Sequence, residues 1–299
     1  MMKKIDAWLF YSEYSYNKKI ESGYIDEIVR KAKEEYGINL EVKNIHKFTL
    51  ISGEENKLLY DGVEVTELPK IAISRRYEIY LFRQFELLGV KVFNNVQSMI
   101  DARNKMKTHQ MLANSGVKTP KTVYIVPKRT VMNIKYEDVS KLLGKKFILK
   151  WIYGSQGTFV HLVDNETDFN ELVLKYQGKV LFQEFIEESF GFDIRAYVLG
   201  GEYVGCAVRK SSSGDFRSNL AKGGSALKFD KEDEIKDLAV QAAKAVNLDI
   251  CGVDILVGKD GYYICEVNAI PGFKSISKVN SINEKDLILN LIRKKLDEK

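Results

Sequence analysis

The residues best suited to chemistry in this sequence are two carboxylates and an amide near its end. Asp254 and Glu266 lie in two apolar segments that are joined by a turn around residues 258–261. If these segments pair as antiparallel strands with residue 254 opposite residue 266, the carboxylates face each other, whereas a shift of one residue separates them. Glu266 and Asn268 are two residues apart and therefore share one strand face, which places Cys265 on the other face.

These three side chains offer oxygen ligands without sulfur or imidazole. Carboxylate and amide oxygens suit a hard divalent cation such as Mg²⁺ or Mn²⁺, and an open set of three suits a metal ion shared with substrate phosphates. A polar, solvated sheet face is the other interpretation, and this pattern alone leaves it open. The Pro271-Gly272 turn ends the strand at the ligands and favours the metal interpretation.

A lysine followed by small residues forms the second candidate feature. Lys150 ends the apolar segment FILK, and Gly154-Ser155-Gln156-Gly157 follows shortly after it. Backbone N–H groups of such a loop can bind phosphates. The loop lacks the G-K-[ST] ending of a Walker A motif, so it is not a P-loop. A plain turn after a lysine at a strand edge explains these residues equally well.

The third feature is a polar segment from Arg209 to Asn219. It contains Arg209 and Arg217, followed directly by Ser218 and Asn219. Arginine binds carboxylates and phosphates through two parallel hydrogen bonds, which suits an anion site. A disordered basic loop is the alternative, and both interpretations remain open at this point.

The elements that must position these residues change in type along the chain. Apolar segments alternate with helical patterns up to residue 98, which predicts a mostly parallel sheet. Later segments are joined by tight turns such as Gly200-Gly201, which are typical of antiparallel hairpins. We therefore predict a parallel α/β domain (1–98) followed by two α+β lobes (99–181 and 182–299).

Between these parts, the pattern predicts one continuous helix over residues 98–116. Ser98 or Asp101 is its expected N-cap, and Gly116 is its expected end. The three histidines His46, His109 and His161 lie outside the candidate motifs. We therefore expect them to be surface or packing residues.

Composition sets limits on the class of protein. The chain has 299 residues, of which 45% are hydrophobic, enough for a core without disulfides. Basic residues exceed acidic ones by 46 − 41 = 5, a mild excess that does not indicate nucleic-acid binding. Cys206, Cys251 and Cys265 are too few and scattered for a disulfide framework, so we expect buried reduced thiols. Without an apolar stretch of about 18 residues or a signal peptide, we predict a soluble cytoplasmic protein with no membrane partner.

The positive charge is concentrated in the middle of the chain. Residues 99–181 carry 14 basic and 7 acidic side chains, a net charge of +7, whereas residues 182–299 carry 17 and 19, a net charge of −2. A basic lobe facing an acidic one suits a polyphosphate that is held between them with metal ions. A solvated lysine-rich surface is the simpler interpretation of the charge alone.

Taken together, these features resemble the ATP-grasp superfamily, and specifically its RimK-type branch of ligases that add glutamate to an amino-acid or protein carboxylate. The resemblance extends from about residue 94 to residue 272 and depends on the order and spacing of six motifs. These motifs are QEFI (183–186), GFDIR (191–195), GDFRSN (214–219), Gly223-Gly224, GVDIL (252–256) and EVNAIPG (266–272).

The resemblance implies an ATP-grasp fold in which ATP lies between the two α+β lobes. It assigns phosphate contacts to Lys105, Lys150, Arg217, Ser218 and Asn219, adenine contacts to Glu184 and Phe185, the ribose contact to Asp193, and a flexible lid to Gly154, Ser155, Gln156 and Gly157. It assigns one or two Mg²⁺ or Mn²⁺ ions to Asp254, Glu266 and Asn268. Catalytic roles fall on Arg217, Asn219 and Arg209, the last near the reacting carboxylate.

The implied reaction is ATP-dependent ligation of a carboxylate to an amine through an acyl phosphate. Glutamate is the favoured amine, and the acceptor carboxylate belongs to a protein, a peptide C-terminus or a small molecule. The alternatives are a ligase acting on a cofactor or an amino-group carrier protein, an ATP-grasp kinase, and a nucleotide-binding regulator without catalysis. Related ligases also suggest a homodimer or homotetramer.

The first domain offers one further candidate for the acceptor side. Arg75-Arg76 follows the apolar segment KIAIS, at the edge of a parallel sheet where ligands tend to bind. We regard this pair as a candidate carboxylate site. The aromatic-rich start of the chain, with Trp8, Phe10 and Tyr11, is expected to fill the sheet core rather than to line a pocket.

Overall fold

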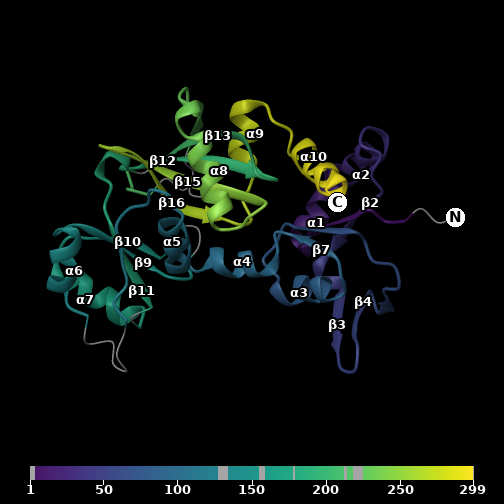
Figure 1. Cartoon of the computed structure of the whole chain (residues 1–299), viewed down its shortest axis with the longest axis horizontal. Coiled ribbons are helices and arrows are strands. Elements are labelled where there is room, and N and C mark those ends of the chain that lie inside the picture. Colours follow the sequence, from purple (N-terminus) through teal and green to yellow (C-terminus); the bar gives the residue numbers. More distant parts are fainter. Residues whose placement is uncertain are drawn as a thin grey trace.

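The computed structural model describes residues 4–126, 134–154, 159–177, 179–211, 214–217 and 225–298 of the chain. Within these residues, three larger sheets follow one another along the sequence, and a small antiparallel sheet accompanies the first (Figure 1). We call the larger ones the N-terminal, central and C-terminal sheets. Each helix in this part of the chain is too short or too polar to cross a lipid bilayer.

The N-terminal sheet is parallel, as the alternation of strand and helix patterns predicts. Its strands lie in the order β2 (Leu40–Asn44), β1 (Ala7–Tyr11), β6 (Ile71–Ser74) and β7 (Lys91–Phe93). All of β1 is buried, because alternate residues face opposite layers. Trp8 and Phe10 pack toward α3 (Ile79–Leu87), whereas Leu9 packs with α2 (Tyr24–Glu34). The aromatic start of the chain therefore fills the core, as expected.

Several elements of this region are not indicated by the sequence patterns. Helix α1 (Glu13–Glu21) follows β1, and an antiparallel sheet follows β2. The strands of that sheet are β3 (Phe48–Ser52), β4 (Asn56–Tyr60) and β5 (Val63–Glu64). Most of β3 is exposed, so it lacks the alternation of apolar and polar residues that identifies a half-buried strand.

The single helix predicted over residues 98–116 is wrong in its start and in its continuity. The structure has α4 (Val96–Arg103) and α5 (Lys105–Asn114), separated at Asn104. The side chain of Asn95, not Ser98 or Asp101, caps α4 by accepting from the Ser98 N–H at 2.9 Å. Asn104 caps α5 in the same way, through the N–H of Lys107. A new helix start is thereby placed directly before Lys105.

The central sheet is antiparallel and has helices on one face. Its strands lie in the order β10 (Val160–Val163), β9 (Phe147–Trp151), β11 (Val180–Glu184) and β8 (Thr122–Val123). Helices α6 (Tyr136–Leu143) and α7 (Glu166–Lys175) pack on the face that carries Phe147, Leu149 and Phe182. Because side chains alternate along a strand, Lys150 and Gln183 belong to the opposite face.

The C-terminal sheet is the largest, and its hairpin turns are those predicted. The strands lie in the order β14 (Ser225–Leu227), β13 (Glu202–Lys210), β12 (Phe192–Leu199), β15 (Ile250–Gly258) and β16 (Gly261–Asn268). Gly200 and Gly201 both have positive φ in the β12–β13 turn, which fits a tight hairpin of the primed type. Helix α8 (Lys236–Ala245) packs on one sheet face through its alanines.

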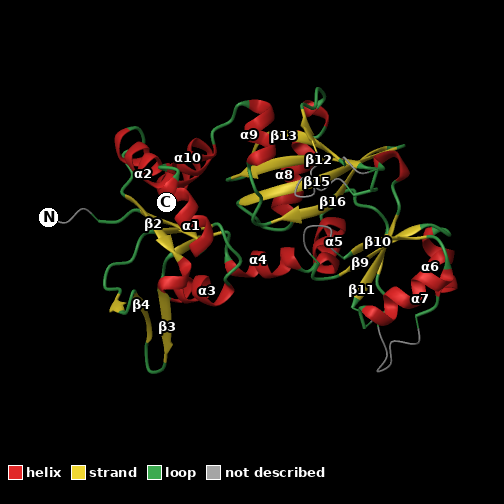
Figure 2. Ribbon diagram, turned by 180° about the vertical axis from the view of Figure 1, so that it is seen from behind, coloured by secondary structure: helices red, strands yellow, loops and turns green. Residues whose placement is uncertain are grey.

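The end of the chain returns to its beginning. After α9 (Lys274–Asn280), helix α10 (Glu284–Asp297) lies beside the N-terminal sheet, as the view from behind also shows (Figure 2). Ile288, Leu289 and Ile292 belong to the same buried cluster as Leu9 and Ile73. The first and last elements of the chain therefore share one core.

Candidate active site

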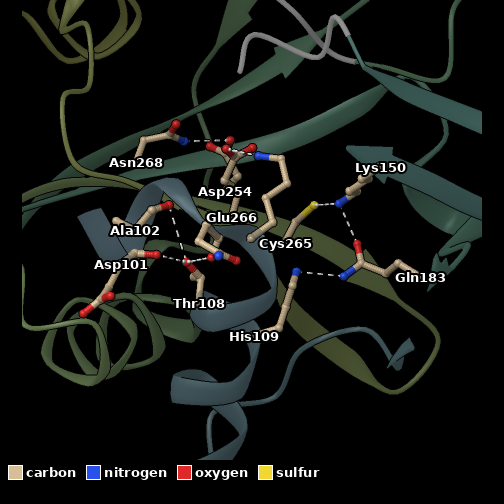
Figure 3. Close-up of polar contacts among 12 residues, drawn as sticks. Asp101, Ala102, Thr108, His109, Lys150, Gln183, Asp254, Cys265, Glu266 and Asn268 are labelled. Atoms are coloured by element: carbon tan, nitrogen blue, oxygen red, sulfur yellow. Dashed lines mark hydrogen bonds and ion pairs between the residues drawn. The ribbon is translucent and has the colours of Figure 1, made fainter. Parts of the chain in front are cut away.

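The hairpin β15–β16 brings the predicted carboxylates together. Asp254 lies directly opposite Glu266, and Gly252 lies opposite Asn268, in the pairing that places both carboxylates side by side (Figure 3). The other face of β15 packs on α8, which leaves this face for polar groups.

The predicted orientation of Cys265 is wrong. A β-bulge follows Asp254, so Ile255 pairs with Ile264 and Cys265 has no partner of its own. Cys265 consequently lines the same cavity as Glu266, and its Sγ lies 3.4 Å from the Lys150 Nζ. The alternation of side chains along a regular strand does not predict the position of Cys265, because the extra residue of a bulge changes the face to which a side chain points. Cys206 and Cys251 are buried and free, as expected.

A cavity of about 340 Å³ lies between the central and C-terminal sheets. Its wall brings together most of the predicted residues that the structure describes. They are Lys150, Glu184, Phe185, Asp193, Arg209, Arg217, Asp254, Glu266 and Asn268. Gly154 and Lys105 are not part of this wall, although Lys105 contacts it through Glu266. The predicted residues Ser155, Gln156, Gly157, Ser218 and Asn219 lie outside the described residues, as do Gly223 and Gly224.

Asp254 is surrounded by positive charge. Arg195 binds it through two hydrogen bonds, one of them from Nη2 to Oδ2 at 2.7 Å, and Arg209 Nη2 lies 3.0 Å from Oδ1. The amide of Asn268 also donates to Oδ2, at 3.3 Å. Burial alone would raise the pKa of Asp254, but the two guanidinium groups outweigh it and hold the pKa below its usual value. Asp254 is therefore ionised at neutral pH.

Three cations at or beside the cavity are also paired with carboxylates. The Lys105 Nζ donates to Glu266 Oε1 at 2.6 Å, and its backbone N–H donates to the Ile152 carbonyl at the start of α5. Arg209 donates from Nε to Asp193 Oδ1 at 2.6 Å, so it is shared between two carboxylates. Arg217 donates from Nε to Asp215 at 2.9 Å. The cavity therefore alternates acidic and basic groups.

Among the cavity residues without a predicted role, two contact predicted site residues through hydrogen bonds of their side chains. Arg195 follows Asp193 by two residues, so strand alternation alone places both on one face, and this signal was available. Gln183, which contacts Lys150, precedes the predicted Glu184 and therefore points to the opposite side of β11, where no role was sought.

The residues present fit a divalent cation. Asp254, Glu266 and Asn268 supply hard oxygen donors on one face and line one cavity. In the described part of the chain, no group of three or more His, Cys, Asp and Glu side chains forms a metal cluster. Asp254 and Glu266 are only two such side chains, because Asn268 contributes an amide. Three ligands from the protein leave coordination positions of a divalent cation free for a substrate.

Comparison with known proteins adds independent findings. Residues 102–292 match the family model described as the RimK-like ATP-grasp domain. A Vibrio vulnificus (strain YJ016) protein named "Probable alpha-L-glutamate ligase" is 30% identical over 283 residues, covering 92% of this chain and 93% of that protein. A protein of the same name from Aliivibrio fischeri (strain MJ11) is 32% identical over 295 residues, covering 95% and 92%.

Solved structures share the fold over the whole chain. The ATP-grasp ligase PsnB, complexed with a minimal precursor, has a TM-score of 0.71 at 19% identity and covers 97% of this chain and 99% of its own. Another PsnB structure contains a precursor variant, Mg and ADP, with a TM-score of 0.68 at 17% identity and coverage of 98% and 99%. D-alanyl-alanine synthetase A from Vibrio cholerae has a TM-score of 0.70 at 13% identity and covers 99% of both chains. The predicted fold class is confirmed.

Proposed function

Because this chain belongs to the RimK-like ATP-grasp family and is an ATP-dependent carboxylate–amine ligase, we propose that the amine it adds is glutamate. The two relatives described above, each named "Probable alpha-L-glutamate ligase", cover 92% and 95% of this chain, which supports glutamate over other amino acids. The ligase chemistry is carried by one observation. A single cavity has oxygen donors at Asp254, Glu266 and Asn268 and cations at Lys150 and Arg217.

In this proposal, the oxygen donors hold Mg²⁺ or Mn²⁺ and the cations hold the triphosphate of ATP. A bound divalent ion supplies positive charge to the phosphate oxygens during transfer. Lys150 and Arg217 add fixed positive charge from the other side of the cavity. We assign the ribose contact to Asp193 and the adenine contacts to Glu184, the last residue of β11, and to Phe185, which follows it; all three line the cavity.

The reaction needs no nucleophile from the protein. An oxygen of the acceptor carboxylate attacks the γ-phosphorus, the bond to the bridging oxygen breaks, and ADP leaves with that electron pair. The unprotonated α-amino nitrogen then attacks the acyl carbon, and phosphate leaves with the electron pair of the C–O bond. The nitrogen finally loses a proton to give the amide. Arg209, shared between Asp193 and Asp254, lies where a guanidinium can bind the reacting carboxylate.

A protein or peptide acceptor is favoured over a small molecule. The fold relative PsnB has been solved with a precursor peptide, and the likeness to this chain covers the whole of that PsnB chain. Acceptor contacts are proposed at Arg75, whose side chain is only 7% exposed. Its Nη2 donates to the Pro271 carbonyl at 2.8 Å, directly after the strand that carries Glu266. The buried Nε and Nη1 have no hydrogen-bond partner among the described residues, and Glu284 Oε1 lies 3.6 Å from Nη2, so an acceptor carboxylate would take the place of the Glu284 side chain.

Trapping the acyl phosphate with hydroxylamine tests the proposal. Purified protein is incubated with Mg²⁺, ATP, glutamate and candidate peptides, and both ADP and the products are followed by mass spectrometry. We expect glutamate-dependent ADP release, a glutamyl peptide, and a peptide hydroxamate when hydroxylamine replaces glutamate. A phosphorylated hydroxyl in the product, without a hydroxamate, would identify a kinase instead. ADP release that depends on a different amino acid would support a ligase but would show that glutamate is not the amine it adds.

Substitutions of two adjacent arginines test separately whether Arg75 contacts the acceptor carboxylate. Arg75→Met removes the buried guanidinium, whereas Arg76→Met changes an exposed neighbour. We expect Arg75→Met to raise the acceptor KM about tenfold while the ATP KM stays unchanged, and Arg76→Met to change neither. Equal acceptor KM values for both variants would exclude Arg75 as the carboxylate contact.

A further inference from the structure

The Lys150 ammonium is held on the cavity wall by a series of hydrogen-bonded polar groups that extends to the C-terminal sheet. Figure 3 shows its first part, from Lys150 through Gln183 to His109. Lys150 on β9 donates to Gln183 Oε1 on β11 at 2.6 Å. The Gln183 Nε2 lies 2.9 Å from Nε2 of His109 on α5. The His109 Nδ1 lies 2.6 Å from the Thr119 hydroxyl, which donates to the carbonyl of Ile264 on β16 at 2.8 Å. Four elements and one loop are thereby connected.

Each donor and acceptor in this chain is determined by its neighbour. The Ile264 carbonyl can only accept, so it takes the single hydrogen of the Thr119 hydroxyl. The Thr119 oxygen must then accept from His109, which places the imidazole proton on Nδ1. The lone pair on Nε2 is left to accept from the amide of Gln183. His109 is therefore neutral and has one tautomer.

The amide of Gln183 likewise has only one possible orientation. The Thr122 hydroxyl donates to the Pro120 carbonyl at 2.9 Å, so its oxygen accepts from Gln183 Nε2 at 2.8 Å. A flipped amide would place its oxygen against two acceptors and its NH₂ group against the Lys150 ammonium. The carbonyl oxygen of Gln183 is therefore aimed at Lys150.

Burial makes this arrangement rigid and keeps it uncharged. Gln183 is 1% exposed, His109 4% and Lys150 6%. Burial, followed by the charges of Lys150 and Lys105, lowers the pKa of His109 to about 3. The group that accepts from the ammonium, the side-chain amide of Gln183, carries no charge at any pH.

We propose that Gln183 and His109 are positioning residues for Lys150. They fix its ammonium at one point of the cavity wall and leave its positive charge for an anionic ligand. Through Thr119 and Ile264 they also connect that point to β16, two residues before Glu266. This inference rests on the proposed function, in which the anion is the triphosphate of ATP.

Two substitutions at His109 separate positioning from packing. The amide oxygen of His109→Gln reaches the place of Nε2 and keeps an acceptor for Gln183. The amide nitrogen of His109→Asn reaches the place of Nδ1 and keeps the donor to Thr119, but it leaves Gln183 without its acceptor. We expect the ATP dissociation constant, measured by calorimetry with Mg²⁺, to rise about tenfold in His109→Asn and less than threefold in His109→Gln. Equal values for the two variants would overturn the proposal.

Two substitutions at Gln183 test whether Lys150 needs an uncharged hydrogen-bond acceptor. Gln183→Glu keeps an acceptor for Lys150 but neutralises its charge, whereas Gln183→Met removes the acceptor. We expect both variants to weaken ATP binding about tenfold or more while the glutamate KM stays unchanged. Unchanged ATP binding in Gln183→Glu would show that the lysine charge is not reserved for the nucleotide and would overturn the proposal.

A measurement on the wild-type protein distinguishes this inference from the proposed function. Long-range ¹⁵N–¹H NMR spectra report the tautomer of each histidine, and His109→Gln identifies the His109 signals. We expect the His109 ring to be neutral at pH 6, with its proton on Nδ1. A charged ring or the other tautomer would contradict the hydrogen-bond directions assigned above and would overturn the proposal. If the tautomer is as expected but the wild-type protein binds no Mg–ATP, the proposed function fails instead.

Discussion

Asp254 and Lys150 are both buried charged groups on one cavity wall, but the protein compensates them in opposite ways. Asp254 is neutralised by two arginines, whereas Lys150 is held by an amide and a thiol that carry no charge. A cation arriving at Asp254 must therefore compete with guanidinium groups already present. An anion arriving at Lys150 meets a charge that is already oriented. A cation can therefore bind Asp254 only by displacing an arginine, whereas an anion can bind Lys150 without displacing another charged group.

The largest expected effect concerns the carboxylate side. Asp254→Asn removes the charge that balances Arg195 and Arg209 and that we propose holds the metal. We expect kcat to fall at least about 100-fold, the size of loss found when a charge-stabilising group leaves an active site. Steady-state ADP release with Mg²⁺ checks this. Asp260→Asn, on the exposed hairpin turn of the same sheet, should retain full activity. Near-native activity of Asp254→Asn would remove the metal assignment.

The corresponding change on the lysine side should act on binding more than on turnover. Lys150→Met removes a pre-oriented charged donor, which is worth roughly 1.5–3 kcal/mol. We therefore expect kcat/KM for ATP to fall about 10- to 100-fold, mainly through KM, as measured by ADP release. The exposed Lys145→Met serves as the matched control in the same lobe. A loss confined to kcat would contradict the view that Lys150 binds the nucleotide directly.

A third test asks whether arginines and metal exchange at Asp254. Arg195→Met leaves this buried carboxylate with Arg209 as its remaining arginine partner. We expect the free energy of unfolding to fall by about 2 kcal/mol, below the roughly 3–5 kcal/mol of a buried pair that is broken completely. Urea unfolding with and without Mg–ATP measures it. The difference from wild type should shrink when Mg–ATP is present, and a constant difference would argue against exchange.

The smallest effect is the pH dependence that His109 imposes on stability. Its pKa is about 3 in the folded protein against about 6.5 when unfolded, so between these values the unfolded chain binds one more proton. Stability therefore decreases as the pH falls, by about 1.4 kcal/mol per unit. Urea unfolding at pH 6 and pH 5 should show this loss in wild type and its absence in His109→Gln. Parallel losses in both proteins would mean that His109 is not buried in its neutral form.

The sequence was sufficient for features that depend on neighbouring residues. The turn near Gly261 predicts that the strands of Asp254 and Glu266 pair, with two registers open, and the family resemblance predicts several residues that line the cavity. The bulge that turns Cys265 into the cavity breaks strand alternation, and no local pattern announces it. The helix break at Asn104 was missed although it carries a local signal, because asparagine favours N-caps over helix interiors.

Contacts between distant elements were beyond the sequence. Gln183, His109 and Thr119 have no shared spacing, and they meet only because β11, α5 and the loop before β8 come together behind Lys150. His109 lies one helical turn after Lys105, so a shared helix face could have suggested a place near the site. Its role as an acceptor for an amide requires three-dimensional coordinates.

The return of α10 to the N-terminal sheet has a consequence for how the protein is made. The core that contains Leu9 and Ile73 also needs Ile288, Leu289 and Ile292, which are synthesised long after them. During translation, the face of the first sheet that α10 covers stays open until residues 284–297 leave the ribosome. Contacts of such long sequence separation form slowly. The emerging chain therefore carries an exposed apolar face until these residues are available, and such a face is prone to aggregation.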